Sequence, residues 1–324
     1  MTKLFLSIGL ILFGLGIGKL IQLGYRSQVI DFPIPLHELR LWLQKIALLF
    51  LNPITVIGAI WIIRFDHSRI ILLPLLGLFA VVTGGFWALA LSRLLRHDDS
   101  RRGSTFVCGA ITNVGAIGGL TCYLFLGEGG YALTPFYTLL VPLAQYCVGF
   151  SVAKFYSPMF PSTDPLARLK KIVADPFILV SMASTLAGCL ANVSGFQRPA
   201  FYKGLNQVAI PLSTSLLLVS AGLTMRVSSV GTYRLECAAM AGIKFLLLPG
   251  MVTLFGFLLG FREIMDGVPL KILLILSAMP VGFLALVPPV LYHLDVDLAN
   301  SCWLFTTGLL IIVLPGLYFL MKVI

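Results

Sequence analysis

Two stretches of the sequence place polar and helix-breaking residues inside otherwise apolar segments. The first surrounds Asn113, with glycines at positions 109, 115, 118 and 119, and the second contains Pro280. Glycine weakens a helix, and proline removes a backbone donor and clashes with the preceding turn. Where a helix is interrupted in this way, the half-helix that follows presents a partially positive N-terminus, which favours an anionic group.

The two stretches also align with each other. When Ala110–Gly115 is placed on Ser277–Gly282, Val114 falls on Val281 and Gly115 falls on Gly282, at an offset of 167 residues (282 − 115). Asn113 then falls on Pro280. The alignment predicts that the two interruptions occupy equivalent positions in an internal repeat. On this basis Asn113, Gly115, Gly118 and Pro280 are candidate substrate-binding residues. The alternative is that the glycines only allow close helix packing and the proline only kinks its helix.

Lys244 is a third candidate because it lies about ten residues inside an apolar segment, where a charge is costly and needs a partner. It could meet a substrate carboxylate, or it could pair with backbone carbonyls or with Glu236. Further polar residues lie in the middle of apolar segments and could line a cavity or merely bond between helices. Among them, Asn52, Gln145 and Ser220 are included in the candidate substrate site.

Other chemistries find little support. The six cysteines lie in or beside apolar runs, without a CxxC pair or a histidine at ligand spacing, so neither a metal site nor a cofactor is predicted. No arrangement of nucleophile, base and acid suggests an enzyme. The net charge of +10 comes from basic residues that fall mostly in short polar breaks, where they face lipid headgroups, and nucleic acid is not an expected partner.

The elements that position these residues are predicted to be membrane-spanning helices. Of the 324 residues, 58% are hydrophobic and 11% are charged, and the mean hydropathy is +0.98. The apolar runs are about 20 residues long, which is the length a helix needs to cross the bilayer. We predict ten spans in an all-α integral membrane protein: 4–24, 41–63, 69–92, 104–126, 131–154, 172–193, 206–226, 234–260, 269–291 and 298–321.

A proline-containing break divides these spans into five and five. We therefore predict a first five-helix repeat over 1–155, a short cytoplasmic linker over 156–171, and a second five-helix repeat over 172–324. Twelve lysines and arginines would lie on the linker's side of the membrane and eight on the other, which places both termini outside a cell (inner) membrane. Because five is an odd number, the second repeat enters the membrane inverted. Inverted repeats with broken helices, here four and nine, are typical of secondary transporters.

The sequence resembles a known family in several motifs. They are Arg102-Gly-Ser-Thr-Phe106, Asn113-Val-Gly-Ala-Ile-Gly118, Gly127-Glu-Gly-Gly130, Asp175-Pro176, Ile210-Pro211 through Ala221-Gly-Leu223, Lys244 to Pro249, and Met279-Pro280. They resemble, in order along nearly the whole chain, the auxin efflux carrier family of permeases. The short central linker is similar to that of the bacterial members.

The resemblance implies a ten-helix fold of two inverted repeats, in which spans four and nine cross with Asn113 and Pro280 beside the substrate. It also implies transport of small organic anions, often carboxylates, by an elevator-like movement of a transport unit against a scaffold, and a homodimer. Two positions depart from the family pattern, Ala116 and Leu120. They alter the shape of the crossing, so the substrate is not carried over from the family.

Two other functions remain open from the sequence. A sodium symporter of the bile-acid type shares the inverted-repeat plan, and a membrane sensor could bind a ligand and signal without translocating it. A proton relay or a carboxylate-lined sodium site normally shows intramembrane acids. Only Glu236 is expected within a span. The sequence therefore favours a permease of a small organic anion.

Overall fold

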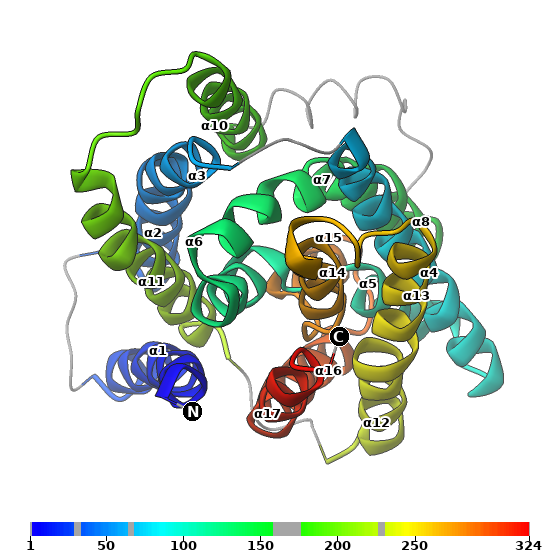
Figure 1. Ribbon diagram of the computed structural model, residues 1–324. Helices are drawn as coiled ribbons and strands as arrows, with labels where there is room; N and C mark the ends of the chain where they lie inside the picture. The colour runs from blue at the N-terminus through cyan, green and yellow to red at the C-terminus, as the bar shows by residue number, and fades with distance from the viewer. Residues whose placement is uncertain (1, 29–33, 64–67, 158–175, 226–230, 324) are drawn as a thin grey trace. The chain divides into compact units, whose positions relative to one another are not determined.

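The computed structural model describes residues 2–28, 34–63, 68–157, 176–225 and 231–323, and within them the chain is helical apart from turns and one isolated β-bridge (Figure 1). The predicted linker over 156–171 lies almost wholly outside the described residues, as do Arg64, Arg226 and Asp175. The all-α prediction therefore holds over the described ranges.

Six helical segments are long and apolar enough to cross a membrane, and a seventh is formed if the bent pair Val296–Gly308 and Leu310–Leu320, at 49° to each other, is one span. The six are Leu4–Arg26, Leu36–Ile60, Ser68–Leu94, Val114–Phe155, Phe201–Gly222 and Arg234–Leu258. The chain is thus a multi-pass membrane protein by length and composition of its helices. Predicted spans four and nine are interrupted, and the part of span six that the structure describes is the shorter apolar helix Leu179–Val193.

The chain forms two compact units. Unit 1 comprises residues 1–66, 119–135 and 175–225, and its main helix pairs are α1 with α11 and α3 with α10. A side chain at Gly18 of α1 would collide with the α11 backbone at Val219 and Gly222, so small residues let these two helices approach closely. The elements of unit 1 are α1 (Thr2–Arg26), α2 (Leu36–Lys45), η1 (Ile46–Leu51), α3 (Asn52–Ile60), most of α6 (Gly119–Thr138), α10 (Pro176–Val193) and α11 (Phe201–Gly222).

Unit 2 comprises residues 67–118, 136–174 and 226–324, and it contains both interrupted helices. Helices α4 and α5 pack closely along their lengths, and Gly84 faces the carbonyl of Gly109 with no room for a side chain. Its elements up to α8 are η2 (Ser68–Leu72), α4 (Leu73–Leu94), α5 (Asp99–Ala110), η3 (Val114–Gly118), α7 (Val141–Ala144), η4 (Gln145–Phe150) and α8 (Ser151–Phe155).

The remaining elements of unit 2 come from the second half of the chain. They are α12 (Arg234–Gly242), η5 (Ile243–Leu247), α13 (Leu248–Leu258), η6 (Met265–Gly267), α14 (Val268–Ser277), η7 (Phe283–Leu286), α15 (Val287–Leu291), α16 (Val296–Gly308) and α17 (Leu310–Leu320). Helix α16 packs against both α5 and α12, and α13 packs against α14. Unit 2 therefore draws the two interrupted helices and their supports from both halves of the chain.

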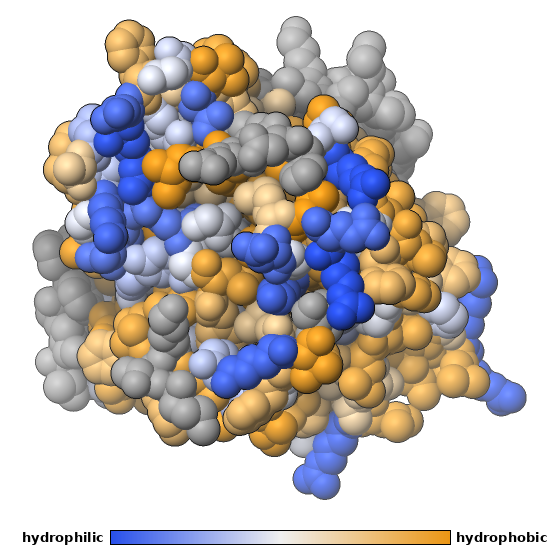
Figure 2. Space-filling model, viewed as in Figure 1, coloured by the Kyte–Doolittle hydropathy of each residue, from blue (hydrophilic) through white to orange (hydrophobic). Residues whose placement is uncertain are grey.

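Large apolar side chains are exposed on both units. Phe5 is 68% exposed, Phe86 60% and Phe155 80%. In the space-filling view, apolar residues cover much of the visible surface, and hydrophilic residues gather in separate clusters (Figure 2). Exposed apolar area of this extent marks a surface whose surroundings are lipid or another protein.

Candidate functional site

Helix α5 ends at Ala110, and the chain that follows is extended. Ile111 has φ −100° and ψ 113°, and helical structure resumes only at Val114, in the π-helical turn η3. The interruption falls at the asparagine predicted to break span four. It gives a half-helix that ends at Ala110 and a second that begins at Val114, with an extended strand between them.

Helix α14 is interrupted in a similar way. It ends at Ser277, the chain is extended at Gly282 with φ −73° and ψ 145°, and the short helical turn η7 begins at Phe283. Pro280 lies in the middle of this interruption, as predicted for span nine. Each interrupted helix therefore contributes one extended strand and one helical N-terminus to unit 2.

The two extended strands pair antiparallel with each other. The amide of Asn113 donates to the carbonyl of Pro280 at 2.9 Å, and the amide of Gly282 donates to the carbonyl of Ile111 at 2.9 Å. Thr112 and Val281 form the isolated bridge between them. Asn113 and Pro280, the two residues that the sequence alignment makes equivalent, thus lie at the point where the strands cross. We call this pair of strands, 111–113 and 278–282, the crossover.

Pro280 affects the geometry of η3, the helical turn that follows strand 111–113. An antiparallel hydrogen-bonded pair exchanges two bonds, but proline has no N–H, so the carbonyl of Asn113 receives no bond from Pro280. That carbonyl instead accepts from the amide of Gly118 at 3.0 Å, five residues later. A bond of this spacing closes a π-helical turn, and such turns are frequent at functional sites.

The first strand is partly open to its surroundings. Asn113 is half-buried, and its side-chain oxygen accepts from the amide of Ile117 at 3.4 Å. A methyl group built at Gly115 would meet nothing within 4 Å, whereas one at Gly118 would lie 2.8 Å from Leu276 and 3.2 Å from Met279. Gly115 therefore keeps an open space beside the N-terminus of η3, and Gly118 allows the chain to pack against α14.

Lys244, in η5, is fully buried and lies at the first strand. Its ammonium group donates to the carbonyl of Gly109 at 2.6 Å, to the hydroxyl of Thr112 at 2.7 Å and to the carbonyl of Ile111 at 3.4 Å. The orphan carbonyls at the C-terminal end of α5 thus receive a cation, which is the favourable partner for that end of a helix. Of the alternatives for Lys244, the structure shows pairing with backbone carbonyls.

The other three sequence candidates lie elsewhere. Gln145 is buried in η4 of unit 2. Asn52 belongs to unit 1, where its side-chain oxygen accepts from the hydroxyl of Tyr131 at 3.1 Å. Ser220 also belongs to unit 1, and its hydroxyl is buried without a hydrogen-bond partner. The crossover therefore brings together Asn113, Gly115, Gly118, Pro280 and Lys244, but not Asn52 or Ser220.

Sequence reasoning missed two hydroxyl groups of the crossover. Thr112 is a partner of Lys244, and the hydroxyl of Thr306, in α16, accepts from the amide of Val281 at 3.2 Å. Thr112 adjoins Asn113 and could have been found by its position. A single threonine in an apolar span, such as Thr306, carries no signal of its own, because such residues commonly bond within their own helix.

A second polar cluster surrounds the start of α5. Asp98 caps this helix through the amide of Arg101 at 2.9 Å. The buried ring of His97 lies 3.5 Å from Glu236, which is thus not a partner of Lys244. Burial lowers the pKa of His97, against the raising effect of Glu236 and Asp98. The hydroxyl of Tyr233 donates to Asp295 at 2.9 Å, and burial together with that carboxylate raises the pKa of Tyr233 to about 12.

Unit 1 also contains a half-buried ion pair that the sequence did not predict. Glu128 accepts from Arg198 at 2.6 Å and 3.1 Å and from Asn206 at 2.6 Å. It follows Gly127, whose φ of 77° and ψ of −165° break the helical path of α6. Two side chains satisfy this carboxylate, so the cluster has a structural role in unit 1.

Among the residues that the structure describes, no group of three or more histidine, cysteine or acidic side chains could hold a metal ion.

Comparison with known proteins finds a distant relative. The chain is 23% identical over 253 residues to an uncharacterized transporter of Methanothermobacter thermautotrophicus, an alignment that covers 76% of this chain and 78% of that protein. No protein-family model matches the chain. A distant relative named as a transporter and the membrane-spanning helices together support a transporter.

Proposed function

We propose that the protein is a secondary transporter of a small organic anion, and that the crossover in unit 2 forms its binding site. The observation that carries this proposal is the pairing of two interrupted helices at Asn113 and Pro280. Irregular backbone at membrane depth persists only where protein buries it or a wet cavity adjoins it, and paired broken helices are the usual mark of a transport site.

The charge at the crossover favours an anion. The first turn of η3 presents the positive end of a half-helix, and Asn113 and Gly115 leave space beside it. Lys244 adds a buried positive charge, and within the described residues it has no carboxylate as a salt-bridge partner. A carboxylate at the N-terminus of η3 would therefore meet a positive potential in a medium of low dielectric constant.

The residues would divide the work. Asn113 offers its side-chain amide to the substrate, Gly115 lets the anion approach the backbone amides, and Gly118 and Pro280 shape the turn. Lys244 acts as a positioning residue, because its three donors already hold Gly109, Ile111 and Thr112. Gln145 belongs to the same unit as these residues, whereas Asn52 and Ser220 would contribute only from unit 1.

The division into two compact units supports an elevator-like mechanism. Unit 1 contains predicted spans one, two, six and seven together with residues 119–135, and unit 2 contains predicted spans three, eight and ten together with both strands of the crossover. Each half of the chain would thus supply two whole spans to a scaffold, and the first half would add residues 119–135 to it. The ten-span topology, the two inverted repeats and the homodimer are parts of this proposal, and the last can be measured by size-exclusion chromatography.

The decisive experiment is flux into proteoliposomes. Labelled dicarboxylates and indole-acetate are offered at fixed membrane potential, with and without sodium, to the native protein and to Asn113→Ala. We expect saturable, sodium-independent uptake that the substitution lowers at least tenfold, while thermal unfolding in detergent changes little. Flux that requires sodium would instead favour a symporter. Tight anion binding without any flux would favour a sensor and contradict the proposal.

A further inference from the structure

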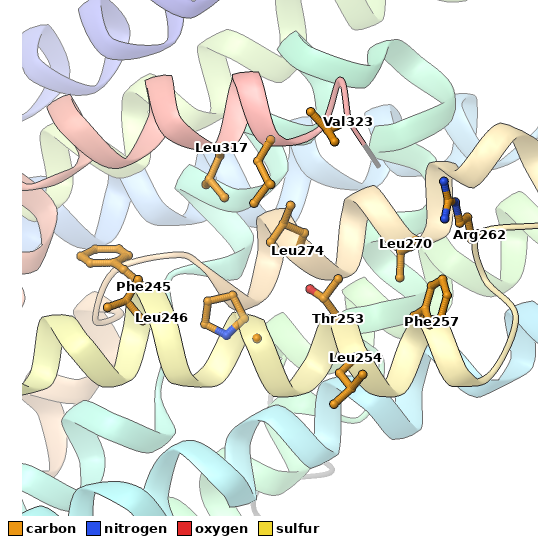
Figure 3. Close-up of a pocket in the computed structure, with 13 residues that line it drawn as sticks. Phe245, Leu246, Thr253, Leu254, Phe257, Arg262, Leu270, Leu274, Leu317 and Val323 are labelled. Carbon is orange, nitrogen blue, oxygen red and sulfur yellow. The ribbon is translucent and has the colours of Figure 1, made fainter.

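A groove on unit 2, distinct from the crossover, lies between three membrane-spanning elements. It has a volume of about 530 Å³, within the usual range of ligand pockets, and its walls come from η5, α13, α14 and α17 (Figure 3). Leu246 on its rim is 75% exposed, Leu254 56% and Val323 79%. Its walls are almost entirely apolar, so the groove opens toward the hydrocarbon of the bilayer.

The groove has the length of one membrane leaflet. It runs along the chain from Phe245 to Phe257, which is about 18 Å at the rise of a helix, and half of the hydrocarbon core is about 15 Å. Phe245 follows Lys244 and so marks the depth of the crossover. At the opposite end is Arg262, in the turn between α13 and α14, as Figure 3 shows.

Arg262 makes one end of the groove polar and positively charged. Its side chain is exposed, and no carboxylate in the described part of the chain forms an ion pair with it, whereas the neighbouring Glu263 pairs with Arg69 at 3.4 Å. Lys322, next to the groove residue Val323, adds a second positive charge near the end of α17. An apolar channel that ends at cations is complementary to a molecule with an apolar chain and an anionic head.

We propose that this groove binds one acyl chain of an anionic phospholipid, with the lipid phosphate at Arg262. An acyl chain matches the apolar walls and a phosphate matches the cationic end of the groove, whereas an apolar helix from a second copy of the chain would leave Arg262 without an anion. Leu270 and Leu274 of α14 line the groove, and α14 ends at the crossover. The bound chain would therefore support the helix that carries the second strand, whether or not the anion proposal holds.

The test is lipid binding to the full-length protein by native mass spectrometry. Phosphatidylglycerol and phosphatidylcholine with identical acyl chains are titrated, with inorganic phosphate as a third ligand. We expect phosphatidylglycerol to bind more tightly than phosphatidylcholine. Arg262→Gln should weaken phosphatidylglycerol about fivefold and leave phosphatidylcholine unchanged, since one basic residue near a membrane surface contributes about this much. Lys271→Gln is the matched control for charge.

Blocking the groove gives an independent arm. A side chain built at Gly250 meets nothing within 4 Å, so Gly250→Leu should fold normally, fill the groove and weaken both lipids. Gly316→Leu, at an equally open glycine of α17 outside the groove, is the control. Equal binding of both lipids, or equal lipid binding by Gly250→Leu and Gly316→Leu, would overturn the proposal. Binding of inorganic phosphate as tight as that of phosphatidylglycerol would also overturn it. So would a Gly250→Leu variant that loses a dimer but binds both lipids as before.

Discussion

The two strands of the crossover share a backbone arrangement and differ in their surroundings. Strand 111–113 is partly open at Thr112 and Asn113, is followed by a glycine-rich turn, and receives the ammonium group of Lys244. Strand 278–282 is buried throughout, with Val281 fully enclosed and bonded to the hydroxyl of Thr306. One strand therefore presents polar groups, and the other is held by packing.

The difference shows how two paired strands can take different roles. Pairing of the strands needs only backbone groups, which both halves of the chain supply. The asymmetry arises at Asn113, which lies opposite Pro280. Because the proline has no N–H to donate, the carbonyl of Asn113 accepts from the amide of Gly118 in the π-helical turn η3. We interpret the first strand as the recognition element and the second as its support.

The largest effect should come from removing the cation at the first strand. Lys244→Met leaves two buried carbonyl oxygens and the half-buried hydroxyl of Thr112 without their donor, and each buried group left in this way costs about 1–3 kcal/mol. We expect the midpoint of thermal unfolding in detergent to fall steeply and anion flux to be lost. The midpoint is measured by intrinsic fluorescence, and flux by uptake of the labelled anion.

Lys19→Met is the matched control for that substitution. Lys19 is a half-buried lysine of α1 that donates to the side chain of Gln22 and to the carbonyl of Met225. Its removal should have a smaller effect, because Lys19 itself is only half-buried and leaves two acceptors without their donor rather than three. Equal stability of the two variants would show that Lys244 does not hold the end of α5.

The two glycines after the first strand should respond in different ways. In Gly118→Ala the new methyl group lies 2.8 Å from Leu276, so we expect a loss of about 1–3 kcal/mol in the free energy of unfolding. In Gly115→Ala the methyl group meets open space, so stability should hold while the KM for the anion rises. Chemical unfolding and concentration-dependent flux measure the two effects. A rise in KM for Gly118→Ala alone would reverse the assignment.

Pro280→Ala tests whether the second strand shapes the first. The new N–H of residue 280 can donate to the carbonyl of Asn113 and compete with the amide of Gly118. We expect faster hydrogen exchange at Gly118, reduced flux, and a stability change within about 1 kcal/mol, the net value of one hydrogen bond. Pro211→Ala, inside α11 of unit 1, should leave flux and the exchange of Gly118 unchanged.

Much of this arrangement was predictable from the sequence because helix breakers act locally. The asparagine, glycines and proline of spans four and nine marked both interruptions, and their alignment identified the pair that bonds across the crossover. The all-helical character followed from the lengths of the apolar runs. The ten-span count stays a prediction, since six or seven segments satisfy the criteria over the described residues.

The partners of the polar groups could not be predicted, because they depend on which helices meet. The sequence left Lys244 with three possible partners, and only the packing of η5 against α5 and its following strand selects the carbonyls. The ion pair of Glu128 with Arg198 joins residues 70 apart in sequence, so no local pattern reveals it. Spacing along one helix suggested Glu236 as an ion-pair partner of Lys244, but in the folded protein Glu236 lies against His97.

The smallest expected effect concerns acid at the start of α5, where His97 and Glu236 lie 3.5 Å apart, whereas α14 begins at Val268 after a glycine N-cap. Burial lowers the pKa of His97 below its usual value of about 6.5, so the unfolded chain takes up a proton at a higher pH than the folded protein does. Stability should therefore be retained above this value and fall as the pH drops through the window below it. Arg101 adds to this lowering of the pKa. Glu236 and Asp98 oppose it, and their opposition keeps the effect small. Thermal unfolding at about pH 7.5 and about pH 5.5, on either side of the usual histidine value, measures the effect, and His97→Gln should lose part of the acid sensitivity. An unchanged pH dependence in that variant would place the acid-sensitive group elsewhere in the protein and separate the start of α5 from the behaviour of the first strand.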